Sequence, residues 1–282
     1  MKNLIVTADD FGMTKSISQG IARACKDGIV TTVSFLPTGE AFRDAVRMAG
    51  ELGLKEAGAH LSLTETRPLT DPSGIPDLVT KDGRFLGGRN AFFMKFFLKG
   101  IDREQIYIEF RSQLDAIKKT GLPITHLSAH EHIHMMPDIL KIFVRLAKEY
   151  DIPVIRYPHK DRQAGNSGIG VFYRSLILSY FAKGMKETLD NASVGYADHF
   201  MGFFDSGKIG EDSLLKMLGA LEDGSTELVC HPGFLGPEIL DRYHFHMNCE
   251  NELFALTSPR VKKFIVEKGI QLTTYLKYLA TK

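Results

Sequence analysis

Cysteine is scarce in this sequence, and the arrangement of the few cysteines argues against a disulfide framework. The 282 residues contain three, Cys25, Cys230 and Cys249, which are far apart and form no C-x-x-C pair. An odd, dispersed set of thiols is typical of a reducing compartment rather than of a small secreted domain. We therefore expect a cytoplasmic protein.

Long apolar runs and an excess of one charge are also lacking. No stretch approaches the roughly 18 apolar residues of a transmembrane helix, and the opening MKNLIVTADD has no signal-peptide core or cleavage site. The 35 basic residues balance 34 acidic ones, so no strong basic field favours nucleic acid or an anionic membrane. We expect no nucleic-acid partner and no stable membrane anchor. A homodimer is expected on general grounds alone.

What the chain does have is a regular alternation of short apolar runs and amphipathic stretches. The apolar runs predict strands at Leu4–Ala8, Thr31–Leu36, Ala57–Leu63, Ile124–Ala129, Pro153–Tyr157, Ala192–Gly195, Glu227–Cys230 and Gln271–Tyr275. Helical periodicity predicts helices at Ser16–Lys26, Glu40–Leu52, Arg103–Lys119, Pro137–Tyr150 and Pro259–Lys268. Roughly seven or eight β-then-α units predict an α/β fold, a (β/α) barrel of TIM-like type that is closed or partly open. A doubly wound open sheet is the alternative.

Two long segments break this rhythm. Residues 64–100 are rich in Pro, Gly and Asp and end in the aromatic run AFFMKFFLKG, while residues 158–210 mix glycines, aromatics and one expected helix. Insertions of this kind usually form binding loops on the rim of a barrel. Because no repeat or clear linker divides the chain, we expect residues 1–282 to form one domain.

Polar residues that could carry chemistry follow several predicted strands. Asp9 and Asp10 end the first strand, where one carboxylate could bind a cation and the other act as a base, although two helix-capping acids would look the same. His60 lies in the run G-A-H-L-S-L, where a hydrogen-bonded core histidine is the plainer interpretation. Arg156 ends the fifth strand and could orient a carboxylate, bind substrate or simply lie on the surface.

Histidines gather at two further strand ends. The segment H-L-S-A-H-E-H-I-H places His126, His130, His132 and His134 within nine positions. Imidazole is the commonest metal ligand near neutral pH, but a catalytic site uses about three protein ligands, so some of the four must serve otherwise. His231, in E-L-V-C-H-P-G, is a candidate general acid or a plain loop histidine. A cysteine nucleophile beside it is disfavoured, because adjacent side chains of a strand face apart.

Four motifs occur in a fixed order along the chain: T-A-D-D-F-G, G-x-H-L-x-L, H-L-S-A-H-x-H-x-H-x-x-P and C-H-P-G. In this order and spacing the sequence resembles the YdjC-like carbohydrate deacetylases, a group that includes chitooligosaccharide deacetylase. Segments 75–79, 82–85, 120–123 and 227–233 are similar to the hopanoid-biosynthesis-associated members. Chitooligosaccharide-type members tend to have Asp where this chain has Ser128, which bears on the substrate more than on the chemistry.

The resemblance implies a β/α-barrel-like fold, a divalent metal and hydrolysis of an N-acetyl group on an amino sugar. By motif position it implies that Asp10, His60 and His130 hold the metal and that Asp9 is the base; spacing alone would not choose His130 over its neighbours. Zn²⁺ or Mg²⁺ is expected first, with Co²⁺ and Ni²⁺ as alternatives. His231 is the expected acid.

We further expect Arg156 to hold the base in orientation. The expected substrate is an N-acetylglucosamine-type sugar, either a free chito-oligosaccharide or the headgroup of a glycolipid such as a glycosylated hopanoid. The aromatic run at 91–98 could touch such a lipid or form a buried helix face. A metal-dependent phosphoesterase could use the same residues. A non-catalytic metal-binding protein is a third reading, which the second, unliganded carboxylate argues against.

Overall fold

Eight parallel strands form one curled sheet in the computed structural model, which describes residues 1–98, 100–159 and 169–280. The strands are β1 (Lys2–Phe11), β2 (Thr32–Phe35), β3 (Ala57–Leu61), β4 (Ile124–Ala129), β5 (Val154–Ile155), β6 (His199–Met201), β7 (Gly224–Cys230) and β8 (Gln271–Leu272). Nearly every residue of β1, β2, β3, β4 and β7 is buried. This is the pattern of a parallel sheet covered on both faces, and it explains the continuous apolar runs of the sequence.

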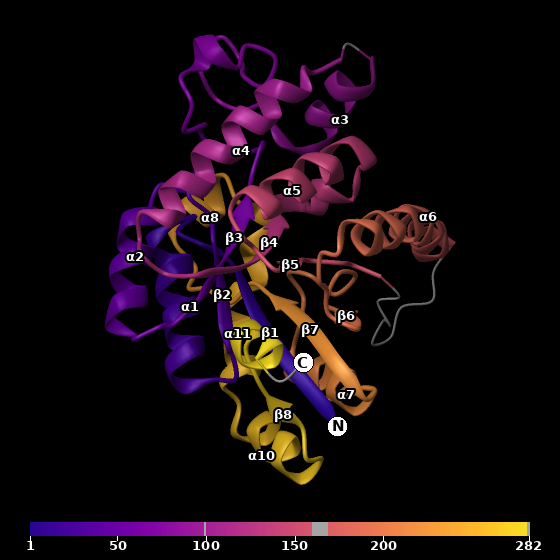
Figure 1. Cartoon of the computed structure of the whole chain (residues 1–282). Coiled ribbons are helices and arrows are strands. Elements are labelled where there is room, and N and C mark those ends of the chain that lie inside the picture. Colours follow the sequence, from indigo (N-terminus) through magenta and orange to yellow (C-terminus); the bar gives the residue numbers. More distant parts are fainter. Residues whose placement is uncertain (99, 160–168, 281–282) are drawn as a thin grey trace.

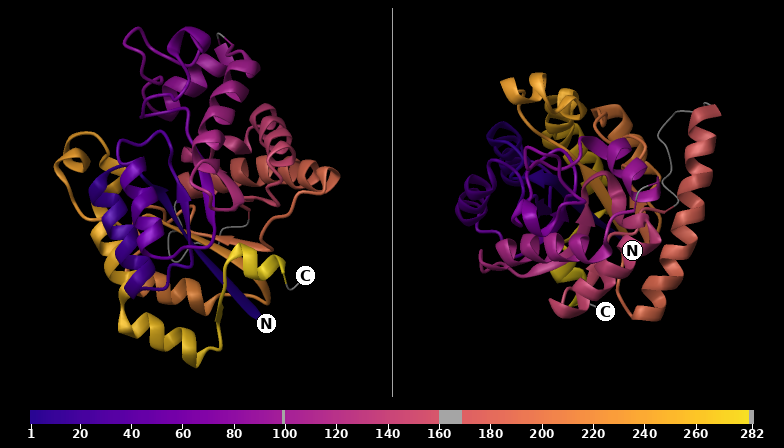
Figure 2. Two further views of the ribbon diagram at one scale, coloured as in Figure 1. Left: turned by 60° about the vertical axis from the view of Figure 1, so that its left-hand side comes forward. Right: turned by 90° about the horizontal axis from the view of Figure 1, so that it is seen from above.

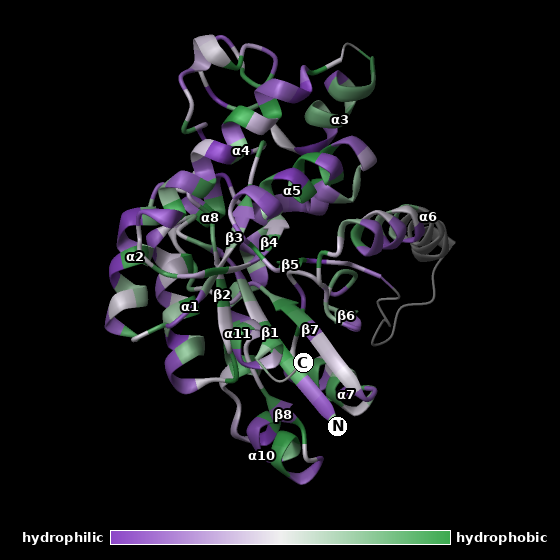
Figure 3. Cartoon of the chain, in the orientation of Figure 1, coloured by the Kyte–Doolittle hydropathy of each residue, from purple (hydrophilic) through white to green (hydrophobic). Residues whose placement is uncertain are grey.

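Helices surround this sheet (Figures 1 and 2). They are α1 (Lys15–Asp27), α2 (Phe42–Glu51), α3 (Gly88–Leu98), α4 (Arg103–Lys118), α5 (Pro137–Glu149), α6 (Ile169–Ala192), α7 (Glu211–Gly219), α8 (Pro237–Asp241), α9 (Cys249–Thr257), α10 (Pro259–Glu267) and α11 (Tyr275–Leu279), with 3-10 helices η1 (Pro72–Gly74), η2 (His130–Met135) and η3 (His244–Asn248). The side chains of Thr14 and Ser258 cap α1 and α10, and Pro137 opens α5. Hydrophilic and hydrophobic residues alternate along α1, α2, α4 and α5, as amphipathic packing requires (Figure 3).

The strand order decides between a barrel and a doubly wound sheet. The order is β5-β4-β3-β2-β1-β7-β6, and β8 pairs with β1 through Asn3 and Leu4. From β1 to β5 each strand lies beside its predecessor in one direction, and β7 and β6 continue around the other side of β1, as in a barrel. Only one parallel bridge, between Val154 and Gly195, links β5 to the segment before β6 in the described part of the chain. The barrel-like prediction is confirmed, and the barrel is incomplete at this gap.

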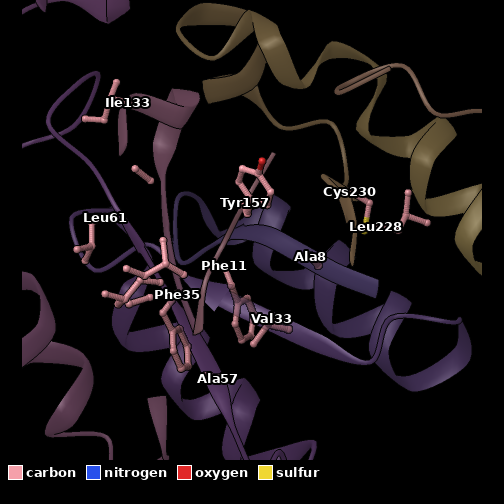
Figure 4. Close-up of a cluster of buried hydrophobic side chains, with 14 of the residues drawn as sticks. Ala8, Phe11, Val33, Phe35, Ala57, Leu61, Ile133, Tyr157, Leu228 and Cys230 are labelled. Carbon is pink, nitrogen blue, oxygen red and sulfur yellow. The ribbon is translucent and has the colours of Figure 1, made fainter. Parts of the chain in front are cut away.

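Apolar side chains fill the space between the sheet and its helices. Phe11 of β1 stacks on Phe35 of β2, with ring centroids 5.3 Å apart. Figure 4 shows these two rings beside Val33, and Leu228 and Cys230 on β7. Because this core is closely packed and apolar, the polar residues buried at the carboxyl ends of the same strands need a separate explanation.

Most predicted elements are present, with ends that differ by a few residues. The predicted strand at Ala192–Gly195 is wrong: α6 continues to Ala192, Gly195 forms only an isolated bridge, and the strand is β6 at His199–Met201. Helices α7, α8, α9 and α11 are additional to the prediction. Residues 160–168 of the predicted second insertion lie outside the described residues, and the single domain with two insertions stays a prediction. Within the described ranges, no helix combines the length and apolarity needed to cross a bilayer.

Candidate metal centre and active site

The sheet brings the predicted site residues to one end of the barrel. Each lies at or just beyond the carboxyl end of a strand: Asp9 and Asp10 on β1, His60 on β3, His130 after β4, Arg156 after β5 and His231 after β7. All six side chains are buried. Buried polar and charged groups are stable only with partners, so the contacts among these residues define the site.

An irregularity in β1 turns both aspartates toward the site. Adjacent side chains of a regular strand face opposite sides, but the pairing of β1 with β2 shifts register between Ala8 and Phe11. Within this interval Asp10 has a φ of 64°, in the left-handed region that non-glycine residues rarely adopt. Bulges of this kind re-aim side chains next to active sites. Here Asp9 reaches Arg156 while Asp10 reaches the histidines.

Arg156 lies between two buried carboxylates. Its Nη1 donates to Oδ2 of Asp9 at 2.5 Å and its Nη2 to Oδ1 at 2.9 Å, while Nε donates to Oε1 of Glu227 at 2.9 Å. Arg156 is 0% exposed, so the surface-arginine alternative is wrong. Burial raises the pKa of Asp9, but the guanidinium of Arg156 and the ring of His60 lower it by more, to well below its ordinary range. Asp9 is therefore ionised at neutral pH.

Asp10, His60 and His130 form a compact group of potential metal ligands. Oδ1 of Asp10 lies 3.0 Å from Nδ1 of His130 and 3.5 Å from Nε2 of His60, and one ligand atom from each residue lies within 4.8 Å of the others. Burial lowers the pKa of His60 to about 4, which leaves a neutral imidazole ready to coordinate. Burial also disfavours charge on His130, yet Asp10 and Glu65 raise its pKa well above the ordinary value. The group therefore favours a positive charge at its centre.

Each histidine of this group has a partner on its other ring nitrogen. Nε2 of His130 lies 3.1 Å from Oε2 of Glu65, and Nδ1 of His60 lies 2.7 Å from Oγ of Ser128. Metal-binding histidines usually donate their second N–H to a carboxylate or another acceptor, which fixes the tautomer and the ring orientation. Neither Glu65 nor Ser128 was expected in this role. The donor set and these outer contacts together fit a divalent cation.

His231 begins the loop that follows β7, lies near His246, and is held by α9 and by the segment after β6. Its backbone N–H donates to Oε2 of Glu252 at 2.6 Å, and its Nδ1 lies 3.4 Å from Oγ of Ser206. Burial lowers the pKa of His231 to about 4, so the ring is neutral at pH 7. The Gly of C-H-P-G is favoured by packing, since a Cβ on Gly233 would lie 2.4 Å from Cδ1 of Ile17 on α1 and 3.1 Å from the Cβ of Cys249.

The remaining histidines of the cluster do not join the metal ligands. Nε2 of His126 lies 2.9 Å from Oγ of Ser34, and His134 faces the backbone oxygen of Arg156 at 3.1 Å. Both side chains are fully buried, and their hydrogen bonds stabilise the core instead of binding the metal. His132 has a left-handed φ of 54° and packs on Phe203, with ring centroids 4.9 Å apart.

Besides Glu65 and Ser128, two further site residues have no counterpart in the sequence-based expectations. Glu227 is the second carboxylate on Arg156, and a charged residue within a buried apolar strand is a signal that could have identified it. His246 of η3 places Nε2 3.1 Å from Oδ2 of Asp10. His246 belongs to none of the four motifs. It lies at the site because the chain after β7 and α8 folds back over the strand ends.

Comparison with known proteins finds similar sequences over nearly the whole chain. The sequence pattern of the family described as YdjC-like protein matches residues 3–267. A protein of Thermoanaerobacter pseudethanolicus named carbohydrate deacetylase is 30% identical over 279 residues, with 98% of each chain covered. A Vibrio cholerae protein of the same name is also 30% identical, over 96% of this chain and 94% of that protein.

A solved structure extends the similarity to the fold. It is described as a putative cellobiose-phosphate cleavage protein from Enterococcus faecalis, and it matches with a TM-score of 0.80, 28% identity and 98% of both chains covered. The match of the family pattern to nearly the whole chain, together with relatives at 30% identity, is decisive. This chain belongs to the YdjC-like protein family.

Proposed function

We propose that this protein is a metal-dependent hydrolase that removes the N-acetyl group from an N-acetylglucosamine-type amino sugar. The observation that carries the proposal is the buried group of Asp10, His60 and His130 beside a second, arginine-bound carboxylate, Asp9. Relatives at 30% identity over almost the whole chain are named carbohydrate deacetylases, which supports a sugar-borne acetyl group as the target.

Asp10, His60 and His130 would hold the metal, and one carboxylate with two imidazoles suits Zn²⁺ as well as Co²⁺, Ni²⁺ or Mg²⁺. A metal bound there lowers the pKa of water and offsets negative charge that develops on a carbonyl oxygen. Glu65 has 31% of its side chain exposed, so the solvent edge of the group lies on the side of His130.

Asp9 is proposed as the base that takes a proton from the attacking water. A carboxylate offers about four lone-pair positions, and Arg156 occupies one on each oxygen of Asp9. Arg156 thus leaves about two positions that a water could use, and its two bonds hold the carboxylate in one orientation. Oδ2 of Asp9 also lies 3.6 Å from Nδ1 of His60, which brings the base to the edge of the metal group.

His231 is proposed as the group that delivers a proton to the leaving amine. Because its pKa is about 4, the ring is neutral before the reaction. The proton balance is satisfied if the proton taken from water by Asp9 is passed on and reaches the amine nitrogen as the C–N bond breaks. In this scheme His231 relays that proton rather than supplying one that it held beforehand.

The sugar is proposed to be carried by a lipid, with a free chito-oligosaccharide as the alternative. Helix α3 buries Phe92 and Phe96 but exposes Met94, Phe97 and Leu98. Figure 1 shows α3 and α4 together at the end of the molecule away from both termini. Exposed apolar side chains that are grouped on one helix are typical of contacts with lipid or protein. They support a glycolipid headgroup as the physiological substrate.

The test is acetate release from N-acetylglucosamine, chitobiose and an N-acetylglucosaminyl lipid, using metal-stripped protein with Zn²⁺, Co²⁺ or Mg²⁺ restored. Asp9→Asn should lower kcat about 10²–10⁴-fold while zinc binding persists, whereas His130→Ala should lose both. His244→Ala, on the exposed side of η3, is the control. Metal-loaded protein that releases no acetate but hydrolyses p-nitrophenyl phosphate would replace the deacetylase by the phosphoesterase alternative.

The lipid part of the proposal has its own test. Replacing Met94 and Phe97 together by Ser should lower kcat/KM for the glycolipid and leave the value for chitobiose unchanged, because the two side chains lie on the surface and outside the metal group. Equal effects on both substrates, or none, would favour the free oligosaccharide.

A further inference from the structure

One carboxylate oxygen of Asp10 and the ring of His246 lie buried against each other at the proposed metal centre, with no aligned hydrogen bond between them. Oδ2 of Asp10 and both ring nitrogens of His246 are inaccessible and unpaired, although Nε2 of His246 lies only 3.1 Å from Oδ2. His246 is 1% exposed and Asp10 is 0% exposed. Buried polar atoms are nearly always satisfied in folded proteins, so an unpaired pair at contact distance indicates a function.

The two oxygens of Asp10 have different surroundings. Oδ1 faces the ligand nitrogens of His130 and His60 at 3.0 and 3.5 Å, while Oδ2 faces His246. A cation shared by Asp10 and the two histidines would therefore contact Oδ1. Oδ2 then needs a donor, and an imidazole nitrogen at 3.1 Å is within the distance of an N–H···O bond.

We propose that His246 is a positioning residue of the metal centre, which donates its Nε2–H to Oδ2 of Asp10 and keeps Asp10 bound to the cation through Oδ1 alone. This inference rests on the metal centre of the proposed function, but it concerns cation binding and not the identity of the substrate. It adds a residue of η3 to a site otherwise built from the strand ends.

The other two ligands of the centre already have such outer partners. Glu65 contacts the second nitrogen of His130, and Ser128 contacts that of His60. Asp10 is the remaining ligand, and His246 completes the set. Outer partners of this kind hold ligands in place, and their loss typically weakens metal binding about 10–100-fold.

Several contacts hold His246 in place. Its backbone N–H donates to the oxygen of Tyr243 at 2.9 Å. Its ring packs edge-on against Phe245 and lies near His231, with centroid distances of 5.2 and 5.9 Å. The same short segment thus borders the proposed proton relay and the outer oxygen of a metal ligand. An ordered η3 is therefore a condition for a correctly held Asp10.

The experiment measures Zn²⁺ affinity of the metal-stripped full chain by competition with a chromogenic chelator. His246→Phe keeps a ring but has no donor, and it should weaken binding about 10–100-fold. His246→Gln places an amide N–H near the Nε2 position and should bind within about 3-fold of wild type, whereas the shorter His246→Asn cannot reach and should weaken binding like Phe. His244→Phe, exposed and two residues earlier in η3, is the matched control and should not change affinity.

The visible spectrum of the Co²⁺-loaded protein provides a second readout, because it reports coordination number. If Asp10 becomes bidentate when its outer donor is lost, the absorption of His246→Phe and His246→Asn should weaken, while His246→Gln should match wild type. If His246→Phe fails to fold, the differences in Zn²⁺ affinity and Co²⁺ spectrum between His246→Gln and His246→Asn test the role of His246. Wild-type affinity and spectrum in all three variants would overturn the role of His246, and so would a wild-type chain that binds no divalent cation. If His246→Phe and His246→Asn lose Zn²⁺ affinity but the wild-type chain deacetylates no sugar, the role of His246 stands and only the proposed function is rejected.

Discussion

Replacing Arg156 by Met should destabilise the fold strongly, and by an amount that grows with pH. Arg156 is the cation between the buried carboxylates of Asp9 and Glu227, and it donates to both. Removing one partner of a buried pair typically costs about 3–5 kcal/mol, because the other charge stays buried and unpaired. Here two carboxylates lose the same partner, so we expect the upper end of this range at pH 8.

The pH dependence follows from the pKa of Asp9, which is held below its ordinary value chiefly by Arg156 acting against burial. A depressed folded-state pKa contributes stability above the unfolded pKa, and this contribution is lost as pH falls. In Arg156→Met the pKa of Asp9 rises, so protonation relieves the buried charge. The difference in unfolding free energy between wild type and variant should therefore be largest at pH 8 and shrink toward pH 5.

The assay is urea unfolding of metal-stripped protein at pH 5 to 8, followed by far-ultraviolet circular dichroism because the chain has no Trp. Arg260→Met is the control, since Arg260 is 63% exposed and pairs with Glu211 and Asp212 on the surface; it should have little effect on stability at any pH. A cost for Arg156→Met no larger than this, or one independent of pH, would refute the reasoning.

Three further predictions concern the same centre. Ser128→Ala should weaken Zn²⁺ binding about 10-fold, measured by chelator competition, because His60 loses the partner of Nδ1; unchanged affinity would contradict this. Glu252 has a pKa raised by burial to about 7, so wild type should lose up to about 3 kcal/mol of stability as pH rises from 4.5 to 7, and Glu252→Gln should lack this loss in urea titrations. Saturation with Zn²⁺ at 100 times Kd should stabilise the fold by about 2.7 kcal/mol, seen as a higher melting temperature that Asp10→Asn abolishes; an equal rise in that variant would place the ion elsewhere.

Buried parallel strands are the part of this fold that the sequence predicts best. The strand predicted at Ile124–Ala129 is β4 with the same ends, because a short segment with β-branched and apolar residues, bounded by Pro123 and the histidine-rich segment, specifies it locally. The three residues of β6 are too few to show a period, so the strand was expected earlier, at Ala192–Gly195. The closure between β5 and Gly195 depends on contacts between distant segments, which no local pattern encodes.

At the site, too, the local sequence predicts some features, and others depend on contacts between distant segments. The histidine-rich segment marks the region, but spacing could not choose His130, because the left-handed backbone at Glu131 and His132 sends successive side chains in different directions. Backbone conformations of this kind are set by the surrounding structure. Partners such as Glu227 and His246 come from other parts of the chain and become visible only when the barrel forms.

The geometry also supplies a physical reason why two adjacent aspartates should have different roles. Asp9 is bound at both oxygens by Arg156, a cation that keeps its proton, so a metal would compete with a permanent charge for the same carboxylate. Burial raises the pKa of Asp10, and the neighbours that lower it are imidazoles; His130 can release its proton when a metal takes its place. Environments that separate two neighbouring carboxyl groups in this way are how one site supports two tasks. The bulge in β1 creates the separation, and it therefore supports Asp10 as the ligand and Asp9 as the base independently of any motif.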